Sequence, residues 1–239
     1  MQPQSPQDEA KRAAAAKAIE TFLHDGMTIG LGSGTTSRFF VRILGDRVKE
    51  GLHVVGVPSS KSTGELAQEV GVPLADLNDI EELDLTIDGA DEIDPKGRMI
   101  KGGGANLLWE KIVASASAKM VAIVDASKRV ERLGRFPLPV EVIPFSWRST
   151  ERQIKKLFKK AGFGDVRIDV RGGTEKPLIT DSGHYLLDCY LQEIADPDFL
   201  GLNLNQIPGV VEHGLFIGIA TDAAIGKTDG TAETISFSR

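Results

Sequence analysis

The chain has 239 residues, of which 41% are hydrophobic and 26% are charged, and its formal net charge at pH 7 is −6. A chain of this length can bury one substantial core and a small second one. Its negative net charge argues against a nucleic-acid-binding surface, and no apolar stretch approaches the length of a membrane span. Its one cysteine, Cys189, excludes an intramolecular disulfide and suits a reducing compartment, so we expect a cytoplasmic protein with neither nucleic-acid nor membrane partners.

The first half of the chain alternates helical and extended patterns. Residues 1–7 are polar and contain proline, and we expect a disordered tail there that precedes a helix over residues 8–23. Up to about residue 136, further helical segments alternate with apolar, β-branched runs that begin at Met27, Val54, Leu83 and Met120. This alternation predicts an α/β fold with a Rossmann-like, doubly wound parallel sheet.

A glycine-rich loop with several hydroxyl groups, residues 30–37, follows the first of these runs and precedes a helical pattern. A strand, a glycine loop and a helix in this order suit a bound phosphate. Thr35 stands where a dinucleotide fingerprint needs its third glycine, and the loop has no P-loop lysine. The later Gly226-Lys227-Thr228 resembles a P-loop ending, but Thr221 replaces the first glycine of that motif. The loop therefore suits one small phosphate, and a plain strand-to-helix turn is an equally good interpretation of the loop alone.

An acidic turn, Asp88-Gly89-Ala90-Asp91-Glu92, follows the apolar run at residues 84–87. If that run is a buried parallel strand, its carboxyl end lies where open α/β sheets bind ligands. Asp and Gly also shape ordinary turns, which is the simpler alternative. A calcium loop is disfavoured because Ile93 stands where an EF-hand needs glycine, and no zinc-binding set is present.

The segment Lys101-Gly102-Gly103-Gly104-Ala105-Asn106-Leu107-Leu108-Trp109-Glu110 carries the strongest chemical signal. Three glycines let the backbone pass close to a ligand, and a helical pattern begins beside them at Leu107. Glu110 inside this helix is a candidate base, because partial burial would raise its pKa toward neutrality. Lys101 could stabilise the oxyanion that such a base creates. Alternatively, Lys101 is a solvated loop lysine and Glu110 a helix-surface residue paired with Lys111.

The pattern changes at residues 135–139, which contain two prolines. A strand at residues 140–143 precedes a helix that opens with a capping-box match at Thr150, then strands at residues 166–170 and 185–191 and a helix over residues 198–206. This order predicts a smaller ferredoxin-like α+β domain over residues 137–206. We expect the segment from Val210 to return to the first domain, which would comprise residues 1–136 and 207–239. The lysines of the helix, residues 155–160, are typical of a solvated face.

Together these segments resemble the type A ribose-5-phosphate isomerase family along nearly the whole chain. The resemblance rests on the following motifs: Gly32-Ser33-Gly34-Thr35-Thr36, Pro58-Ser59-Ser60, Asp88-Gly89-Ala90-Asp91-Glu92, Lys101-Gly102-Gly103-Gly104, Glu110-Lys111, Asp125-Ala126-Ser127-Lys128 and Pro208-Gly209-Val210-Val211-Glu212-His213-Gly214-Leu215-Phe216. It implies an aldose–ketose isomerase of the non-oxidative pentose phosphate pathway, forming a homodimer or homotetramer and using no metal or nucleotide cofactor.

The resemblance also assigns roles to residues. It makes Glu110 the proton-transferring base and Lys101 the group that stabilises the enediolate, and it gives Asp88 and Asp91 contacts with the sugar hydroxyls and a part in ring opening. The residues that it places around the sugar phosphate are Lys11, Ser33, Gly34, Thr35, Thr36, Gly89, Ala90, Gly102, Gly103, Gly104 and Lys128.

Two positions depart from the family pattern. Trp109 stands where the family usually has an arginine and His184 where it usually has an asparagine, and we assign neither residue to chemistry. His213 lies in a matching segment, and we expect a structural role for it. Two other functions are alternatives. A sugar-phosphate sensor would need a helix-turn-helix, for which we expect the N-terminal segment to be too short. A CoA-transferase-like enzyme would need a CoA-sized site.

Overall fold

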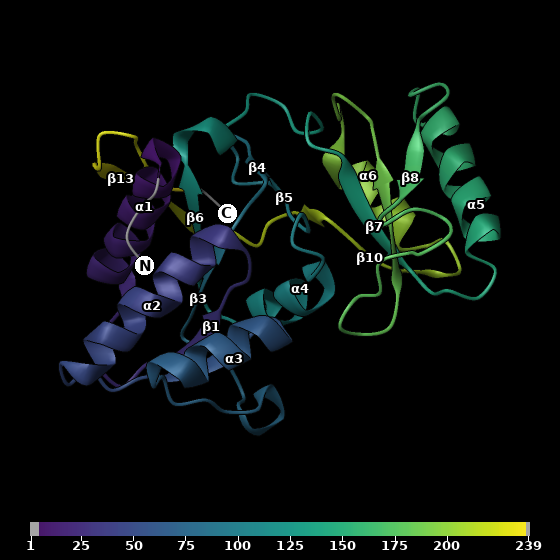
Figure 1. Cartoon of the computed structure of the whole chain (residues 1–239). Coiled ribbons are helices and arrows are strands. Elements are labelled where there is room, and N and C mark those ends of the chain that lie inside the picture. The colour runs from purple at the N-terminus through teal and green to yellow at the C-terminus, as the bar shows by residue number, and fades with distance from the viewer. Residues whose placement is uncertain (1–4, 238–239) are drawn as a thin grey trace.

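A six-stranded sheet organises the larger part of the protein in the computed structural model, which describes residues 5–237 (Figure 1). Its strands are β1 (Thr28–Leu31), β2 (Val55–Pro58), β3 (Leu85–Gly89), β6 (Met120–Asp125), β12 (Asp222–Gly226) and β13 (Ala232–Ser236). They lie in the order β13-β12-β6-β3-β1-β2, and all neighbours pair in parallel except β12 and β13. The parallel sheet predicted from the alternating pattern is confirmed, with an antiparallel hairpin added at one edge.

Helices cover both faces of this sheet. They are α1 (Pro6–Phe22), α2 (Thr35–Lys49), α3 (Lys61–Val70) and α4 (Leu107–Ser115), with short 3₁₀ helices η1 (Leu77–Asp79) and η2 (Ala126–Lys128). Successive side chains of a strand point to opposite faces. Val121 and Ile123 of β6 accordingly pack in the cluster that contains the apolar residues of α1, α2 and α3, whereas Ala122 packs with Ala114 of α4. The sheet is therefore doubly wound.

Two helix starts differ from the expectation. The α1 helix begins at Pro6, because the Ser5 side chain accepts a hydrogen bond from the N–H of Asp8 at 3.1 Å and caps it. The expected tail is thus helical at residues 6–7, and residues 1–4 lie outside the described residues. Helix α5 (Trp147–Lys160) begins one turn before the capping-box match, and Thr150 is buried inside it with its hydroxyl 3.4 Å from the carbonyl of Pro208.

The smaller layer is an antiparallel four-stranded sheet with two helices. Its elements are β7 (Leu138–Val142), α5, β8 (Ile168–Val170), β9 (Tyr185–Cys189), α6 (Pro197–Leu204) and β10 (Val210–His213), and the strand order is β10-β7-β9-β8. The order β-α-β-β-α-β is that of a ferredoxin-like fold. The strand at Val210 was expected to return to the first domain and does not, because it pairs with β7 as the fourth strand of the small sheet. The division of the chain into two domains stays a prediction. With β10 included, the smaller of these two domains would extend to His213.

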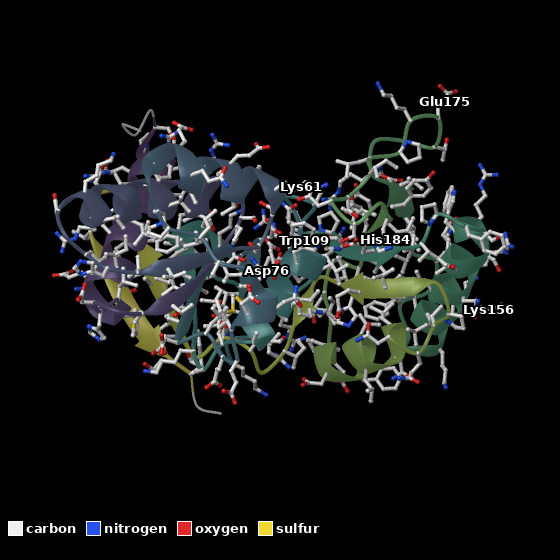
Figure 2. The ribbon with its side chains drawn as sticks, turned by 90° about the horizontal axis from the view of Figure 1, so that it is seen from below. Lys61, Asp76, Trp109, Lys156, Glu175 and His184 are labelled. Atoms are coloured by element: carbon white, nitrogen blue, oxygen red, sulfur yellow. The ribbon has the colours of Figure 1, made fainter. Side chains whose placement is uncertain are left out.

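Several contacts join the two layers of the molecule, which are the six-stranded sheet with its helices and the four-stranded sheet with its helices. A small sheet of β4 (Glu92–Ile93), β5 (Met99–Ile100) and β11 (Leu215–Phe216) connects them. The loop before β9 reaches α3, where the Asp181 carboxylate accepts a hydrogen bond from the N–H of Lys61 at 2.9 Å. In Figure 2 Lys61, Trp109 and His184 lie in the middle of the molecule, where the layers meet. No helix among the described residues is long and apolar enough to cross a membrane.

Candidate active site

The site lies at the carboxyl ends of β1 and β3, neighbouring parallel strands. In the sheet, β2 lies on one side of β1 and β3 lies on the other, so the chain changes its direction across the sheet at this point. Open α/β sheets bind ligands at such a switch point. The two strand ends approach each other closely. The N–H of Ser33 donates to Asp88 Oδ1 at 2.9 Å, and a Cβ at Gly32 would lie 2.2 Å from the same oxygen. A residue with a side chain therefore cannot replace Gly32 without a shift of Asp88.

A cavity of about 350 Å³ opens at this point. It is lined by residues 33–36, 89–91, 101–104, Lys11, Glu110, Lys128, Gln7 and Phe136. Every residue that the resemblance placed around the sugar phosphate lines this cavity, so residues from five separate segments of the chain meet there. Asp88 lies behind the lining and is fully buried. The sequence reasoning missed Gln7, which it placed in a tail, and Phe136, which it treated only as part of a boundary.

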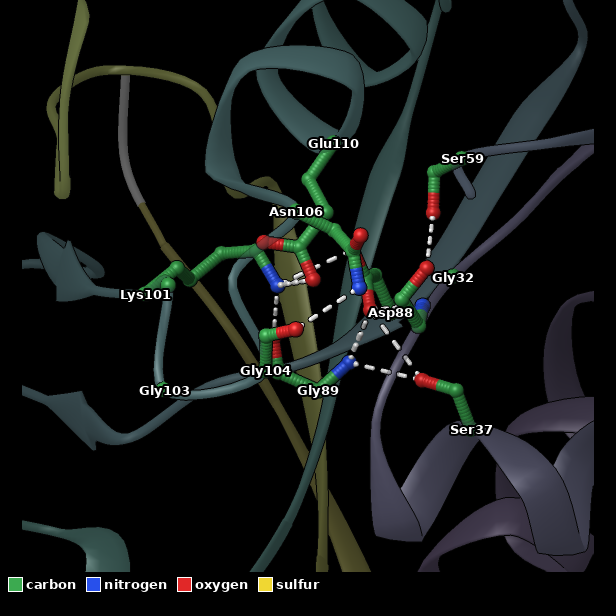
Figure 3. A network of polar contacts seen from close by, with 12 residues as sticks. Gly32, Ser37, Ser59, Asp88, Gly89, Lys101, Gly103, Gly104, Asn106 and Glu110 are labelled. Carbon is green, nitrogen blue, oxygen red and sulfur yellow. Dashed lines mark hydrogen bonds and ion pairs between the residues drawn. The ribbon is translucent and has the colours of Figure 1, made fainter. Parts of the chain in front are cut away.

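Three charged side chains form what we call the cavity cluster: Lys101, Asp88 and Glu110 (Figure 3). The Lys101 Nζ lies 2.9 Å from Asp88 Oδ2 and 3.4 Å from Glu110 Oε1, and it also donates to the carbonyl of Gly89. The other oxygen of Asp88 accepts hydrogen bonds from the Ser37 hydroxyl at 3.1 Å and the Gly89 N–H at 2.7 Å. Glu110 Oε2 is buried and has no hydrogen-bond partner in the described part of the chain.

Burial and charge shift the acid–base properties of this cluster. Burial raises the pKa of Glu110 to about 8, and it does so against the opposing effect of the Lys101 charge. Burial alone would lower the pKa of Lys101, but the carboxylates of Asp88 and Glu110 outweigh it and raise the pKa above its ordinary value. Lys101 therefore stays an ammonium, while Glu110 can hold or release a proton near neutral pH. A group with these properties is suited to general acid–base catalysis.

The glycine run, residues 102–104, brings backbone to the cavity. Gly102 has a φ of +105°, a conformation that favours glycine. A Cβ at Gly103 would lie 2.5 Å from an oxygen of Asp91, and the Gly103 N–H donates to Asp91 Oδ2 at 2.8 Å. Helix α4 starts directly after the run and carries Glu110 in its first turn. The run thus holds Asp91 near Glu110 without side chains in the way.

The other side of the cavity has features that favour a bound anion, and we call it the candidate anion site. Gly34, with a φ of +90°, precedes the first turn of α2 at Thr35 and Thr36. The first N–H groups of a helix have no partner within the helix and favour a bound anion. Lys11 of α1 and Lys128 of η2 line the same cavity and bring positive charge. The Ser33 hydroxyl is instead held in a buried network with the hydroxyls of Ser59 and Ser60, each at 2.9 Å.

Comparisons with known proteins show which family this chain belongs to. The model of the family described as ribose 5-phosphate isomerase A (phosphoriboisomerase A) matches residues 55–230. The chain belongs to the ribose 5-phosphate isomerase A family. It is 52% identical over 227 residues to ribose-5-phosphate isomerase A 2 of Yersinia pseudotuberculosis, covering 95% of this chain and 96% of that protein.

Solved structures agree with this placement in the ribose 5-phosphate isomerase A family. The Plasmodium falciparum ribose 5-phosphate isomerase has a TM-score of 0.90 at 33% identity, covering 96% of this chain and 99% of that one. A D-ribose-5-phosphate isomerase in complex with phospho-erythronic acid has a TM-score of 0.88 at 35% identity, covering 96% and 98%. The expected α/β architecture, with its smaller antiparallel sheet, is therefore that of solved family members.

The two departures from the pattern of the ribose 5-phosphate isomerase A family both lie between the layers. The indole N–H of Trp109 donates to the Ser182 hydroxyl at 2.8 Å. The Nδ1 of His184 lies 3.0 Å from Glu141 Oε1, which also accepts from the Thr180 hydroxyl at 2.8 Å. Neither Trp109 nor His184 lines the cavity. Trp109 therefore joins α4 to the loop before β9, His184 contacts residues of the small-sheet part, and neither contacts the predicted reaction centre.

A second group of titratable side chains, which we call the interlayer cluster, consists of the partly buried Lys111 and Glu212 and the buried His213. The Lys111 Nζ donates to Glu212 Oε1 and to the carbonyl of His213, both at 2.7 Å. The Nε2 of His213 lies 3.0 Å from the carbonyl of Gly201, so it carries the proton, and Nδ1 accepts from the Leu215 N–H at 3.2 Å. Burial lowers the pKa of His213 to about 4. The contacts of this neutral histidine agree with the structural role expected for it.

No group of three or more His, Cys, Asp or Glu side chains among residues 5–237 is arranged to hold a metal ion. Cys189 is buried in β9 without a disulfide partner, and burial raises the pKa of its thiol well above the ordinary value. A thiol in this state is poorly suited to act as a nucleophile. The titratable groups at the cavity wall are thus lysines and carboxylates.

Proposed function

We propose that this protein interconverts D-ribose 5-phosphate and D-ribulose 5-phosphate through an enediolate, as a step of the non-oxidative pentose phosphate pathway. The observation that carries the proposal is Glu110, a buried carboxyl group at the cavity wall with a pKa of about 8 and an ammonium 3.4 Å away. Moving a proton from C2 to C1 of a sugar needs a base of this kind and a positive charge beside the oxygen that becomes negative. The names of the relatives describe the same reaction.

In the proposed reaction Glu110 removes the proton from C2 and returns it to C1. Lys101 stabilises the oxyanion of the enediolate, because its positive charge is held in a buried site where it needs no reorganisation during the reaction. Asp91 lines the cavity, and we propose that it contacts the sugar hydroxyls and assists ring opening. Asp88 is fully buried behind the lining, and we propose that its main contribution is to hold Lys101 in place.

The phosphate occupies the anion site in this proposal. Thr35 and Thr36 at the start of α2, together with Lys128 and Lys11, would bind it and so fix the distance of C1 and C2 from Glu110. Binding energy from the phosphate then orients the reacting carbons. One related isomerase is known in complex with phospho-erythronic acid, and a phosphorylated acid of this kind would suit a cavity with an anion site on one side and Lys101 on the other.

The deciding experiment follows the proton in D₂O. Purified protein treated with a chelator is given ribose 5-phosphate, and ribulose 5-phosphate is measured by its absorbance and by NMR. We expect turnover with deuterium from solvent at C1. Complete retention of the C2 hydrogen at C1 would contradict transfer through a base that exchanges its proton with solvent, and activity that is lost with chelator and restored by a divalent ion would contradict the metal-free mechanism.

Rival functions and cellular context are tested separately. Binding of sugar phosphate without turnover would favour a sensor, and thioester exchange would favour a CoA-transferase-like enzyme. We also propose that the protein is a cytoplasmic homodimer or homotetramer, as its resemblance to the family implied. Light scattering of the purified protein measures the oligomeric state, and a molar mass of one chain would contradict that part of the proposal.

A further inference from the structure

An arginine of the smaller layer contacts the glycine run. Arg171, directly after β8, donates from Nη1 to the carbonyls of Gly102 at 2.7 Å and Gly103 at 3.2 Å. Its other nitrogens form a two-bond ion pair with Asp188 of β9, with Nε to Oδ2 at 2.9 Å and Nη2 to Oδ1 at 2.5 Å. The side chains of Arg171 and Asp188 are 17% and 16% exposed. A carboxylate of the small sheet thus orients a guanidinium onto the backbone of the cavity wall.

The peptide between Gly102 and Gly103 is held at both of its edges. Its carbonyl accepts from Arg171, and its N–H donates to Asp91 Oδ2 at 2.8 Å. In a trans peptide the carbonyl and the N–H point in opposite directions, and no cis peptide occurs among the described residues. The chain of contacts therefore runs from Asp188 through Arg171 and one peptide plane to the carboxylate of Asp91.

This support matters because the run consists of three glycines. Glycine has the largest backbone freedom of any residue, so an unrestrained run would sample many conformations. On the other side of the run, the N–H of Lys101 donates to the carbonyl of Gly214 at 2.9 Å. Gly214 thus fixes the backbone at Lys101, just before the run, and Arg171 fixes the backbone within the run at Gly102 and Gly103. Without Arg171, the second of these restraints is lost.

We propose that Arg171, oriented by Asp188, is a positioning residue for the isomerase reaction: it fixes the glycine run so that Asp91 and Lys101 keep their places relative to Glu110. The inference rests on the proposed function of this cavity. It assigns the small sheet a part in catalysis, since the layer that carries Arg171 contributes none of the three charges of the cavity cluster. Misplacement of a reacting group by about 1 Å can lower a rate by roughly 10²-fold.

The chain offers a matched control at the other end of β8. Arg167 forms the same kind of two-bond ion pair with Asp169, with Nε to Oδ1 at 3.2 Å, but this pair is 69% and 40% exposed. Arg167 forms no hydrogen bond with the glycine run in the described part of the chain, and its guanidinium lies 4.5 Å from the centre of the Tyr190 ring. Replacing Arg167 by alanine therefore removes a similar ion pair from the small sheet without touching the cavity wall.

The test compares Arg171→Ala, Arg171→Lys and Arg167→Ala by kinetics and amide hydrogen exchange. For Arg171→Ala we expect kcat to fall roughly 10- to 100-fold, with inhibition by inorganic phosphate changed less than about threefold because the anion site is untouched. Arg171→Lys should recover only part of the rate, because an ammonium cannot contact Asp188 and two carbonyls in the fixed geometry of a guanidinium. Arg167→Ala should keep the wild-type kcat.

Amide exchange separates this proposal from the proposed function. We expect faster exchange at residues 102–106 in Arg171→Ala and no change there in Arg167→Ala. Unchanged exchange at these residues, a kcat within about twofold of wild type, or an equal loss in Arg167→Ala would overturn the proposal. Absence of turnover in the wild-type protein would instead contradict the proposed function, and the exchange measurement would still decide whether Arg171 holds the glycine run.

Discussion

The cavity cluster and the interlayer cluster use the same kinds of side chain with different results. In each, a lysine contacts carboxylate and backbone oxygens, and both lysines lie over the ring of Phe216, Lys101 at 5.5 Å and Lys111 at 4.9 Å from its centre. Burial lowers the pKa of Lys111 below its ordinary value. The pKa of Lys101 is raised, because two carboxylates outweigh the effect of its burial.

The difference lies in the carboxylates. The pKa of Glu212 is shifted in the opposite direction from that of Glu110. Burial would raise the pKa of Glu212, but Lys111 and the His213 N–H lower it, so Glu212 stays ionised. Glu110 shares its lysine with Asp88, leaves one oxygen without a hydrogen bond among the described residues, and lines the cavity. A buried ion pair becomes a reactive group when one carboxylate is left incompletely paired beside a cavity. Mutations in matched pairs can test this explanation.

The largest effect should come from the carboxylates. Glu110→Gln keeps the shape but removes the proton acceptor, so we expect kcat to fall by roughly 10²–10⁴-fold while the substrate still binds. In the matched variant Glu212→Gln, kcat should stay within about threefold and the free energy of unfolding should fall by about 1 kcal/mol. Steady-state kinetics and urea unfolding measure both. A near-wild-type kcat for Glu110→Gln would remove Glu110 from the mechanism.

The lysines provide the second comparison. Lys101→Met loses a positive charge that the enediolate needs more than the sugar does, and we expect a fall in kcat on the order of 10²-fold or more. Lys111→Met should lower the free energy of unfolding by about 1–3 kcal/mol, because Glu212 loses its partner, with little change in kcat. If Lys101→Met changes only KM, then Lys101 binds the ground state and the two clusters do not differ as described.

The anion site should affect binding more than chemistry. Lys128→Ala removes a charge that lines the cavity away from the cavity cluster, so we expect KM for ribose 5-phosphate and the inhibition constant of inorganic phosphate to rise together by roughly 10-fold. Ribose without phosphate should be a very poor substrate. Turnover of ribose at the rate of its phosphate, or unchanged constants in Lys128→Ala, would contradict the assignment of the anion site.

The pH dependence of the rate should report Glu110. The base must be ionised, and burial raises its pKa to about 8 in the free protein, so kcat/KM should increase with pH, reach half of its maximum near pH 8 and level off above it. Well below that pH the change should approach about tenfold per pH unit. A profile of kcat/KM measured from pH 6 to 9 checks this. A plateau that begins near pH 5 would mean that Glu110 is fully ionised at neutral pH.

The two clusters should also affect stability with opposite signs. Between pH 4.5 and 8 folded Glu110 keeps a proton that the unfolded chain has released, so its contribution to the free energy of unfolding falls as pH rises, by up to about 1.4 kcal/mol per pH unit. His213, with its pKa lowered from 6.5 to about 4, contributes stability that is lost as pH falls through this range. The stability of Glu110→Gln relative to wild type should therefore increase from pH 6.5 to 8. A difference independent of pH would show that burial does not raise the pKa of Glu110.

Much of the site could be predicted because its residues lie in short motifs at element ends. The carboxyl end of a strand, a glycine loop and a helix start each have local signals, which mark Asp88, Thr35 and Lys101, and the last two of these residues line the cavity. Gln7 and Phe136 have no such signal. They reach the cavity because α1 packs across the sheet and because the chain passes between the layers there.

The sequence by itself predicted the doubly wound sheet, since apolar periodicity is a property of neighbouring residues, and its motifs carried the resemblance to the family, which in turn implied most of the residues that line the cavity. Only the tertiary structure decided that Val210–His213 completes the small sheet, that Asp88 lies behind the cavity wall, and that Arg171 reaches the glycine run. Strand pairing and burial depend on residues far apart in the chain. The raised pKa of Glu110 likewise arises from burial, which the charges of Asp88 and Asp91 reinforce and the charge of Lys101 opposes, and no local pattern contains these contacts.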